Sequence, residues 1–149
     1  GYLTKIPGTV TSLVTTVFIY IAYEYLGYTD LKFSIIFFTL LFFYSFYAVK
    51  DAESEFKNKD PRQIVIDEVL GQAIPLIFVL YLSQNNQLSL QIEIYYVLSF
   101  VFFRFFDILK PFPVSYFDKN FKNYFGIIMD DIMAGLYSML LIYLISLKF

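Results

Sequence analysis

Five apolar stretches dominate the sequence, and each is close to the length that a helix needs to cross a bilayer. They run over residues 9–28, 33–49, 64–82, 92–109 and 126–147. A transmembrane helix takes about 20 residues, so five such stretches leave little of a 149-residue chain for a domain outside the membrane. Hydrophobic residues make up 58% of the chain, which exceeds the usual proportion in soluble domains. We therefore predict a single all-α domain over residues 1–149, a polytopic membrane bundle of about five transmembrane or membrane-embedded helices.

The composition excludes several kinds of active site. The chain has no Cys and no His, which excludes a thiolate nucleophile, an imidazole base, a disulfide and any Cys or His metal ligand. The net charge of −2 provides no excess of cations to neutralise nucleic-acid phosphates, so we expect no nucleic-acid binding. Any chemistry must depend on carboxylates, Lys, Arg, hydroxyl groups or a bound metal ion.

The ends of the apolar stretches carry helix signals. Residues 50–57 are charged and helix-forming, so the second helix is expected to continue beyond the apolar stretch until Asp60-Pro61. The Lys110-Pro111-Phe112-Pro113 run is expected to break the fourth helix, because proline disrupts a helix interior. The chain opens at Gly1 without Met or a signal-peptide pattern, and we expect its N-terminus to be incomplete.

Basic residues collect at one end of the predicted spans. If the five spans alternate in direction, Lys32 and Lys148 lie at one end and nine Lys and Arg residues lie at the other. The nine are Lys5, Lys50, Lys57, Lys59, Arg62, Arg104, Lys110, Lys119 and Lys122. The positive-inside rule predicts that the loops 50–62 and 110–125 face the cytoplasm and that the loop 83–91 lies outside.

Five carboxylates lie within the apolar stretches, all near the same end. They are Asp67 and Glu68 in the third stretch, Asp107 in the fourth, and Asp130 and Asp131 in the fifth. A carboxylate inside a span is costly and usually marks a functional site. Five at one depth would repel one another unless they were protonated, paired with Lys or Arg, or bound to a divalent cation. Oxygen ligands suit a hard cation, so we expect a Mg²⁺ site.

Each acidic pair is followed by a glycine one helical turn later. Asp67 and Gly71 are four residues apart, as are Asp131 and Gly135. This spacing places each Asp and Gly on one helix face, where glycine permits close approach of a neighbouring helix. We expect the two helices to pack at these glycines and to present their carboxylates to a shared cavity. The alternative is that the acidic pairs stand at helix starts, where they satisfy free N–H groups.

Cationic side chains near these carboxylates are candidate phosphate ligands. The candidates are three cations in the fourth apolar stretch and the loop after it: Arg104, Lys110 and Lys119. The alternative for Arg104 is an ion pair with Asp107 at i, i+3, and for the two lysines it is contact with lipid headgroups.

The opening of the first helix offers a second candidate phosphate site. Pro7-Gly8-Thr9 could bind a phosphate through backbone N–H groups and the Thr9 hydroxyl. The alternative is that Thr9 or Thr11 caps the helix.

Long ordered motifs in the chain closely resemble the phosphatidylglycerophosphatase A family. The motifs are Pro7-Gly8-Thr9, Asp60-Pro61, 64–72 with Asp67-Glu68-Val69-Leu70-Gly71, 103–113 with Arg104, Asp107 and Lys110-Pro111, and Met129-Asp130-Asp131-Ile132-Met133-Ala134-Gly135. The resemblance covers nearly the whole chain. It implies a multi-pass enzyme of the bacterial inner membrane with its active site on the cytoplasmic face. The implied reaction is Mg²⁺-dependent hydrolysis of the terminal phosphomonoester of phosphatidylglycerophosphate, which yields phosphatidylglycerol in phospholipid biosynthesis.

The resemblance also implies roles for individual residues. The catalytic set is Asp67, Glu68, Asp107, Asp130 and Asp131. Of these, Asp67, Asp130 and Asp131 are expected to bind Mg²⁺, and Glu68 or Asp107 to act as general base or as an outer carboxylate. The residues expected to bind the substrate phosphate are Arg104, Lys110 and Thr9. Whether water or a carboxylate is the nucleophile, how many metal ions bind and which oligomer forms are left open.

Two other functions fit a carboxylate-containing membrane protein. An ion- or proton-coupled transporter also places carboxylates within spans, but spreads them across the depth of the membrane. A noncatalytic membrane subunit could use an acidic face to bind a partner, and it would tolerate Asp131→Glu, which a tight metal site should not.

Overall fold

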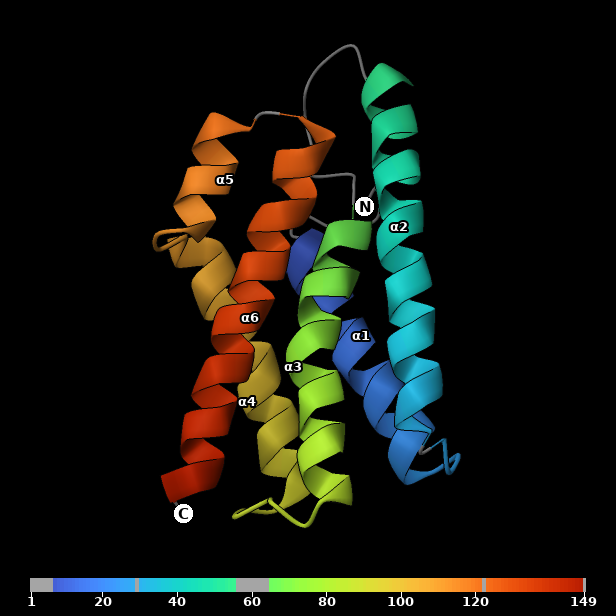
Figure 1. The fold of residues 1–149 in the computed structure, drawn as a ribbon, viewed down its shortest axis with the longest axis vertical. Helices are drawn as coiled ribbons and strands as arrows, with labels where there is room; N and C mark the ends of the chain where they lie inside the picture. Colours follow the sequence, from blue (N-terminus) through green and yellow to red (C-terminus); the bar gives the residue numbers. More distant parts are fainter. Residues whose placement is uncertain (1–6, 29, 56–64, 122, 149) are drawn as a thin grey trace.

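The computed structural model describes residues 7–28, 30–55, 65–121 and 123–148, with the side chains of all of these except 51–55 and 148. The regular structure in these ranges is entirely helical (Figure 1). The helices are α1 (Pro7–Glu24), α2 (Leu31–Glu55), α3 (Ile66–Gln84), α4 (Ile92–Leu109), α5 (Val114–Asn120) and α6 (Tyr124–Lys148). The prediction of an all-α membrane bundle is confirmed for the described part of the chain.

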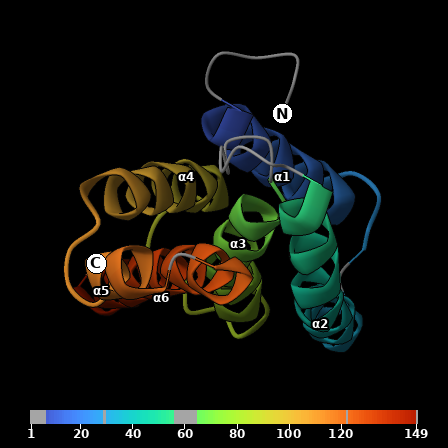
Figure 2. The ribbon, with the colours of Figure 1, turned by 90° about the horizontal axis from the view of Figure 1, so that it is seen from above.

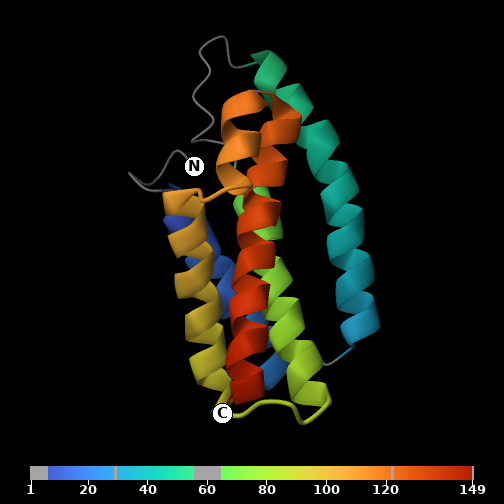
Figure 3. The same cartoon turned by 60° about the vertical axis from the view of Figure 1, so that its left-hand side comes forward.

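The five long helices run alternately up and down, and α3 lies at the centre of the bundle. It packs against α1, α2, α4 and α6, which surround it when the molecule is seen from above (Figure 2). The short helix α5 packs on the first half of α6 (Figure 3). Because each long helix contacts α3, α6 or both, side chains from several helices can meet at either end of α3.

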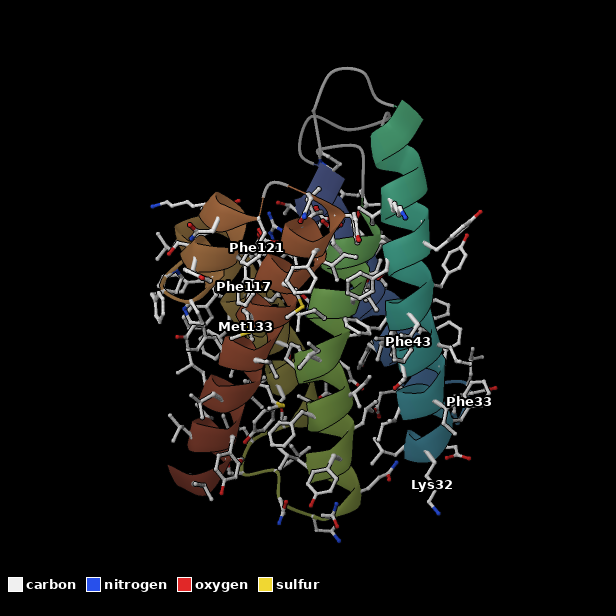
Figure 4. The ribbon with its side chains drawn as sticks, turned by 45° about the horizontal axis from the view of Figure 1, so that its top comes forward. Lys32, Phe33, Phe43, Phe117, Phe121 and Met133 are labelled. Carbon is white, nitrogen blue, oxygen red and sulfur yellow. The ribbon has the colours of Figure 1, made fainter. Side chains whose placement is uncertain are left out.

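One end of the bundle collects the charged residues of interest, and we call it the charged end. It contains Glu68, Arg104, Lys110 and Asp130, and it comprises the starts of α1, α3 and α6 and the ends of α2 and α4 (upper end in Figure 1). Lys32 lies at the opposite end (Figure 4). The predicted separation of the two ends therefore holds for these described residues.

Several residues of the predicted basic cluster, and the predicted helix break at Asp60-Pro61, lie outside the described part of the chain. They are Lys5, Lys57, Lys59, Asp60, Pro61, Arg62 and Lys122, together with Ile64 at the predicted start of the third stretch.

Three described helices are long and apolar enough to cross a membrane. The spans are Leu31–Lys50 in α2, Ile66–Gln84 in α3 and Tyr124–Leu147 in α6. Only 17% of the apolar window in α2 is buried within the protein, so most of its large side chains require lipid around them. Helices α1 and α4 are 18 residues long and lie beside these spans in the same bundle. The large exposed apolar surface of this bundle is therefore expected to contact the hydrocarbon of the bilayer rather than water.

The helix ends follow the sequence signals, with one addition. Helix α2 continues through the charged residues to Glu55, and α4 ends at Leu109, as predicted. Lys110 then adopts a left-handed backbone conformation with φ of 46°, which turns the chain before Pro111. Helix α5 was not predicted. The sequence does contain a helical spacing here, with Val114, Phe117 and Phe121 at i, i+3 and i+7. Three positions are too few to distinguish a short helix from a loop.

Helices α3 and α6 cross at the two glycines that the sequence singles out. A Cβ atom added to Gly71 would lie 2.6 Å from the carbonyl oxygen of Asp131. A Cβ atom on Gly135 would collide with the carbonyl oxygen of Gly71. Both neighbours are backbone atoms, so neither can move aside as a flexible side chain would. The predicted packing at Gly71 and Gly135 is confirmed, and it brings the acidic pairs of the two helices to one level.

Candidate metal centre

Three carboxylates from two helices converge at the charged end. Asp67, Glu68 and Asp131 each offer one oxygen, and these three oxygens lie within 4.8 Å of one another. Asp67 is 7% exposed and Asp131 is 4% exposed. Oδ1 of Asp67 and Oε2 of Glu68 are buried and make no hydrogen bond with the described residues. This donor set consists only of oxygen atoms, and its buried acceptors are unmet, so it fits a hard divalent cation such as Mg²⁺.

The two helices supply these carboxylates from different positions. Asp67 and Glu68 stand in the first turn of α3, where the helix dipole favours negative charge. Asp130 and Asp131 lie well inside α6, which begins at Tyr124. The helix-start alternative is therefore wrong for the second pair, although its position suits the first. Asp131 owes its place to the crossing at Gly71 and Gly135.

Asp130 is not part of this three-carboxylate group and forms an ion pair with Lys110. The ammonium of Lys110 donates to Oδ2 of Asp130 at 2.7 Å and to Oδ1 of Asp118 on α5 at 2.5 Å. Oδ1 of Asp130 accepts the backbone N–H of Asp131 at 3.0 Å. Both oxygens of Asp130 are thus engaged beside the three-carboxylate group, and Lys110 ties α5 to α6. The role of Asp118 as a partner of Lys110 is apparent only in the structure.

The two carboxylates change the acid–base behaviour of Lys110, which follows the end of α4. Burial lowers the pKa of its ammonium, but the hydrogen bonds and charges of Asp118 and Asp130 outweigh burial and raise the pKa above the ordinary 10.5. A raised pKa means that Lys110 binds its proton more tightly in the folded state. Its ion pairs therefore stabilise the fold fully below pH 10.5, and this contribution is lost as the pH rises through the raised pKa.

We expect Lys110→Met to lower the free energy of unfolding at neutral pH by on the order of 1 kcal/mol, because the pair with Asp130 is only partly shielded from solvent. Thermal unfolding in detergent micelles, followed from neutral to strongly alkaline pH, measures this. The difference between wild type and variant should shrink at alkaline pH. Lys119→Met, which removes an exposed Lys of α5, is the control. A difference that does not vary with pH would contradict the assignment.

Arg104 and Asp107 form an ion pair one turn apart on α4, as the alternative interpretation expected. The Nε atom of Arg104 is buried and makes no hydrogen bond with the described residues. Gly8, at the start of α1, lies next to the side chains of Glu68 and Arg104. A Cβ atom there would meet the Glu68 carboxylate and would lie 3.3 Å from Nη1 of Arg104. The start of α1, the carboxylate group and one guanidinium therefore share one small region, which could hold a phosphate beside a cation.

The first turn of α1 shows that neither Thr9 nor Thr11 caps the helix. Helix α1 begins at Pro7, so Thr9 lies inside the helix rather than before it. The Thr11 hydroxyl donates to the carbonyl oxygen of Pro7 at 2.9 Å, back along the helix. Neither threonine is an N-cap, and the expectation that one caps the helix is wrong. Thr9 lies one residue from Gly8, at the edge of the region described above.

Sequence reasoning missed one buried polar residue next to the site. Gln72 lies one turn below Glu68 on α3 and is completely buried, and neither of its side-chain polar atoms has a hydrogen-bond partner among the described residues. The sequence could have pointed to Gln72, because a polar residue four positions after Glu68 in an apolar stretch lies on the same helix face.

The charged groups of α3 and α6 are confined to one depth. The acidic residues of both helices lie in the half nearer the charged end, and the buried side chains beyond them are mainly apolar, among them Leu76, Val79 and Ile142. This arrangement disfavours a transporter, whose ion pathway would need charged or polar groups across the membrane.

Comparison with known proteins agrees with the motifs. A family model for phosphatidylglycerophosphatase A matches residues 1–146. The phosphatidylglycerophosphatase A of Haemophilus influenzae is 36% identical over 100 residues, 67% of this chain and 56% of that protein. The phosphatidylglycerophosphatase A of Escherichia coli K12 is 36% identical over 87 residues, 58% of this chain and 45% of that protein.

A third relative carries a different name. A protein of Bacteroides thetaiotaomicron named "Putative phosphatidylinositol-3-phosphatase" is 40% identical over 84 residues, 56% of this chain and 48% of that protein. The chain thus spans about half the length of the curated relatives it matches. No solved structure matches it. Since the family model covers nearly the entire sequence and its motifs meet in the carboxylate site, this chain belongs to the phosphatidylglycerophosphatase A family.

Proposed function

We propose that this protein is a Mg²⁺-dependent lipid phosphatase. It hydrolyses the terminal phosphomonoester of phosphatidylglycerophosphate to give phosphatidylglycerol in phospholipid biosynthesis. It acts in the bacterial inner membrane, with the charged end facing the cytoplasm. The observation that carries this proposal is the buried group of Asp67, Glu68 and Asp131 beside Arg104 and the start of α1.

We assign different roles in the proposed reaction to the residues of the site. Asp67, Glu68 and Asp131 would hold Mg²⁺, which when bound supplies electrostatic stabilisation of the phosphoryl oxygens. Asp130 is engaged with Lys110 and would support the site from one side. Arg104 would hold the phosphate, kept in place by its ion pair with Asp107.

The hydrolysis itself breaks one bond and forms another. Water attacks the phosphorus in line, or a carboxylate attacks it and water then hydrolyses the acyl phosphate so formed. In either case the bond between phosphorus and the glycerol oxygen breaks and phosphate is released. The leaving oxygen takes up a proton and becomes the hydroxyl of phosphatidylglycerol. Where water attacks, a carboxylate oxygen of the site that does not hold Mg²⁺ can accept its proton.

The relatives' names identify a substrate class rather than a single lipid. One names a phosphatidylinositol 3-phosphatase and two name phosphatidylglycerophosphatases. Both substrates are phosphomonoesters on the headgroup of a glycerophospholipid, so a single cation-and-arginine site suits either. We propose phosphatidylglycerophosphate because the family model and two of the three relatives carry that name.

Purified protein in mixed micelles is expected to release phosphate from phosphatidylglycerophosphate with added Mg²⁺ and to stop with excess chelator. Phosphatidylinositol 3-phosphate, assayed in parallel, should be hydrolysed more slowly. Phosphate release that chelator leaves unchanged would contradict the metal requirement. Release from neither lipid would contradict the proposed function, and faster release from the inositol lipid would reassign the substrate.

A further inference from the structure

A stripe of exposed apolar side chains runs along the outer side of α4 and continues beyond the end of this helix. It consists of Val97, Val101, Phe105, Ile108, Phe112 and Tyr116, which we call the outer stripe. On α4 its members recur every three or four residues and so lie on one helix face. Phe112 is the most exposed, at 75%. Along the chain, exposed apolar side chains therefore continue from α4 through the proline turn into α5.

Helix α5 is held against the bundle by its other face. Val114 is buried against the side of α6, and the rings of Phe117 and Phe121 contact Phe125 at the start of α6. Figure 4 shows Phe117, Phe121 and Met133 at this junction between α5 and α6. The Tyr137 hydroxyl donates to the carbonyl oxygen of Phe112 at 2.6 Å and secures the turn. The side of α5 that packs on α6 is thus occupied, whereas Tyr116 on α5 and Phe112 in the turn before it are exposed.

The two exposed rings form a pair just beyond the end of α4. Phe112 and Tyr116 meet edge to face with ring centroids 6.2 Å apart. The following residues, Asp118, Lys119 and Asn120, are exposed and polar. An aromatic pair followed by polar residues at the end of an apolar helix is the arrangement found where hydrocarbon gives way to lipid headgroups.

We propose that Phe112 and Tyr116 form a membrane-binding surface, so that α5 lies in the interfacial layer of the bilayer at the charged end. The occupant is the phospholipid bilayer itself, because Phe112 and Tyr116 directly follow the exposed apolar face of α4, a helix of the membrane bundle, along the chain. The exposed polar residues of α5 remain in the headgroup region, where they stay hydrated.

This placement also implies a route by which a lipid substrate reaches the carboxylate site, an inference that rests on the proposed function. Lys110 binds both Asp118 of α5 and Asp130 of α6, so the helix in the interface is linked through Lys110 to the neighbour of Asp131. A lipid phosphate bound near the turn before α5 would lie beside Lys110, at the end of the bundle that holds Arg104 and the three carboxylates. The substrate would then enter sideways from the leaflet rather than from water.

The chain has no Trp, so a single introduced Trp reports on one position. Phe112→Trp, reconstituted into phosphatidylcholine and phosphatidylglycerol vesicles with brominated acyl chains, is expected to emit at short wavelength and to lose intensity to the bromine. Val101→Trp on α4 is the reference for a lipid-facing site, and Lys119→Trp on α5 is the matched control for a hydrated one. Iodide in the buffer should quench Lys119→Trp and spare the other two.

Quenching of Phe112→Trp by iodide and not by bromine would overturn the proposal, because the surface would then face water. Protection from both quenchers would also overturn it, because protein, such as a second copy of the chain, would then cover the surface. Far-ultraviolet circular dichroism verifies that each variant keeps its helix content. The measurement involves no substrate, so its outcome does not depend on the proposed phosphatase activity.

Discussion

Asp131→Asn is expected to abolish phosphate release while the protein still folds and inserts into the membrane. Asn keeps the volume of Asp but removes a formal negative charge from a group whose three oxygens lie within 4.8 Å. Loss of an outer-shell partner of a metal site costs about 10–100-fold, and loss of a direct ligand should cost at least as much. The measurement is kcat/KM for phosphatidylglycerophosphate across a Mg²⁺ titration, together with thermal unfolding in detergent.

Two further variants separate the possible explanations. Glu93→Gln removes one exposed carboxylate at the opposite end of α4 and should leave turnover unchanged. Asp131→Glu keeps the charge but lengthens the side chain, so it should impair a tight metal site and spare an acidic face that merely binds a partner. Wild-type turnover of Asp131→Asn at every Mg²⁺ concentration would contradict the carboxylate site, and full tolerance of Asp131→Glu would favour the noncatalytic subunit.

Gly135→Ala is expected to destabilise the bundle and to lower activity with it. The added methyl group would collide with the backbone of Gly71 on α3, and a helix backbone cannot move aside without shifting the whole helix. Overpacking of this kind costs about 1–3 kcal/mol, and Val at the same position should cost more. Separation of α3 from α6 would also pull Asp131 away from Asp67 and Glu68.

Thermal unfolding in detergent measures the stability change, and phosphate release per folded molecule measures the effect on the site. Leu136→Val, on the exposed side of α6 next to Gly135, is the control and should unfold near the wild-type temperature. If Gly135→Ala unfolded at the wild-type temperature, the close helix crossing would be refuted.

The sequence by itself determined the helical class, most of the helix limits and the end of the bundle at which the acidic pairs lie. These features follow from local rules: the length of a span, the proline run after Leu109 and the helix period that places Asp67 with Gly71 and Asp131 with Gly135. The glycine spacing even anticipated which helices cross. It did so because a small residue is needed wherever two backbones approach closely, and the sequence displays that need directly.

Only the tertiary structure decided which carboxylates meet. Consecutive residues on a helix point about 100° apart, so Asp130 and Asp131 have different neighbours. The rotation of α6 against α3, set by the glycine crossing, turns Asp131 toward Asp67 and Glu68 and leaves Asp130 to Lys110. That ion pair in turn needs the left-handed turn at Lys110, which brings the chain back over α6. Such pairings depend on the relative rotation of helices distant in sequence, and no local pattern encodes that angle.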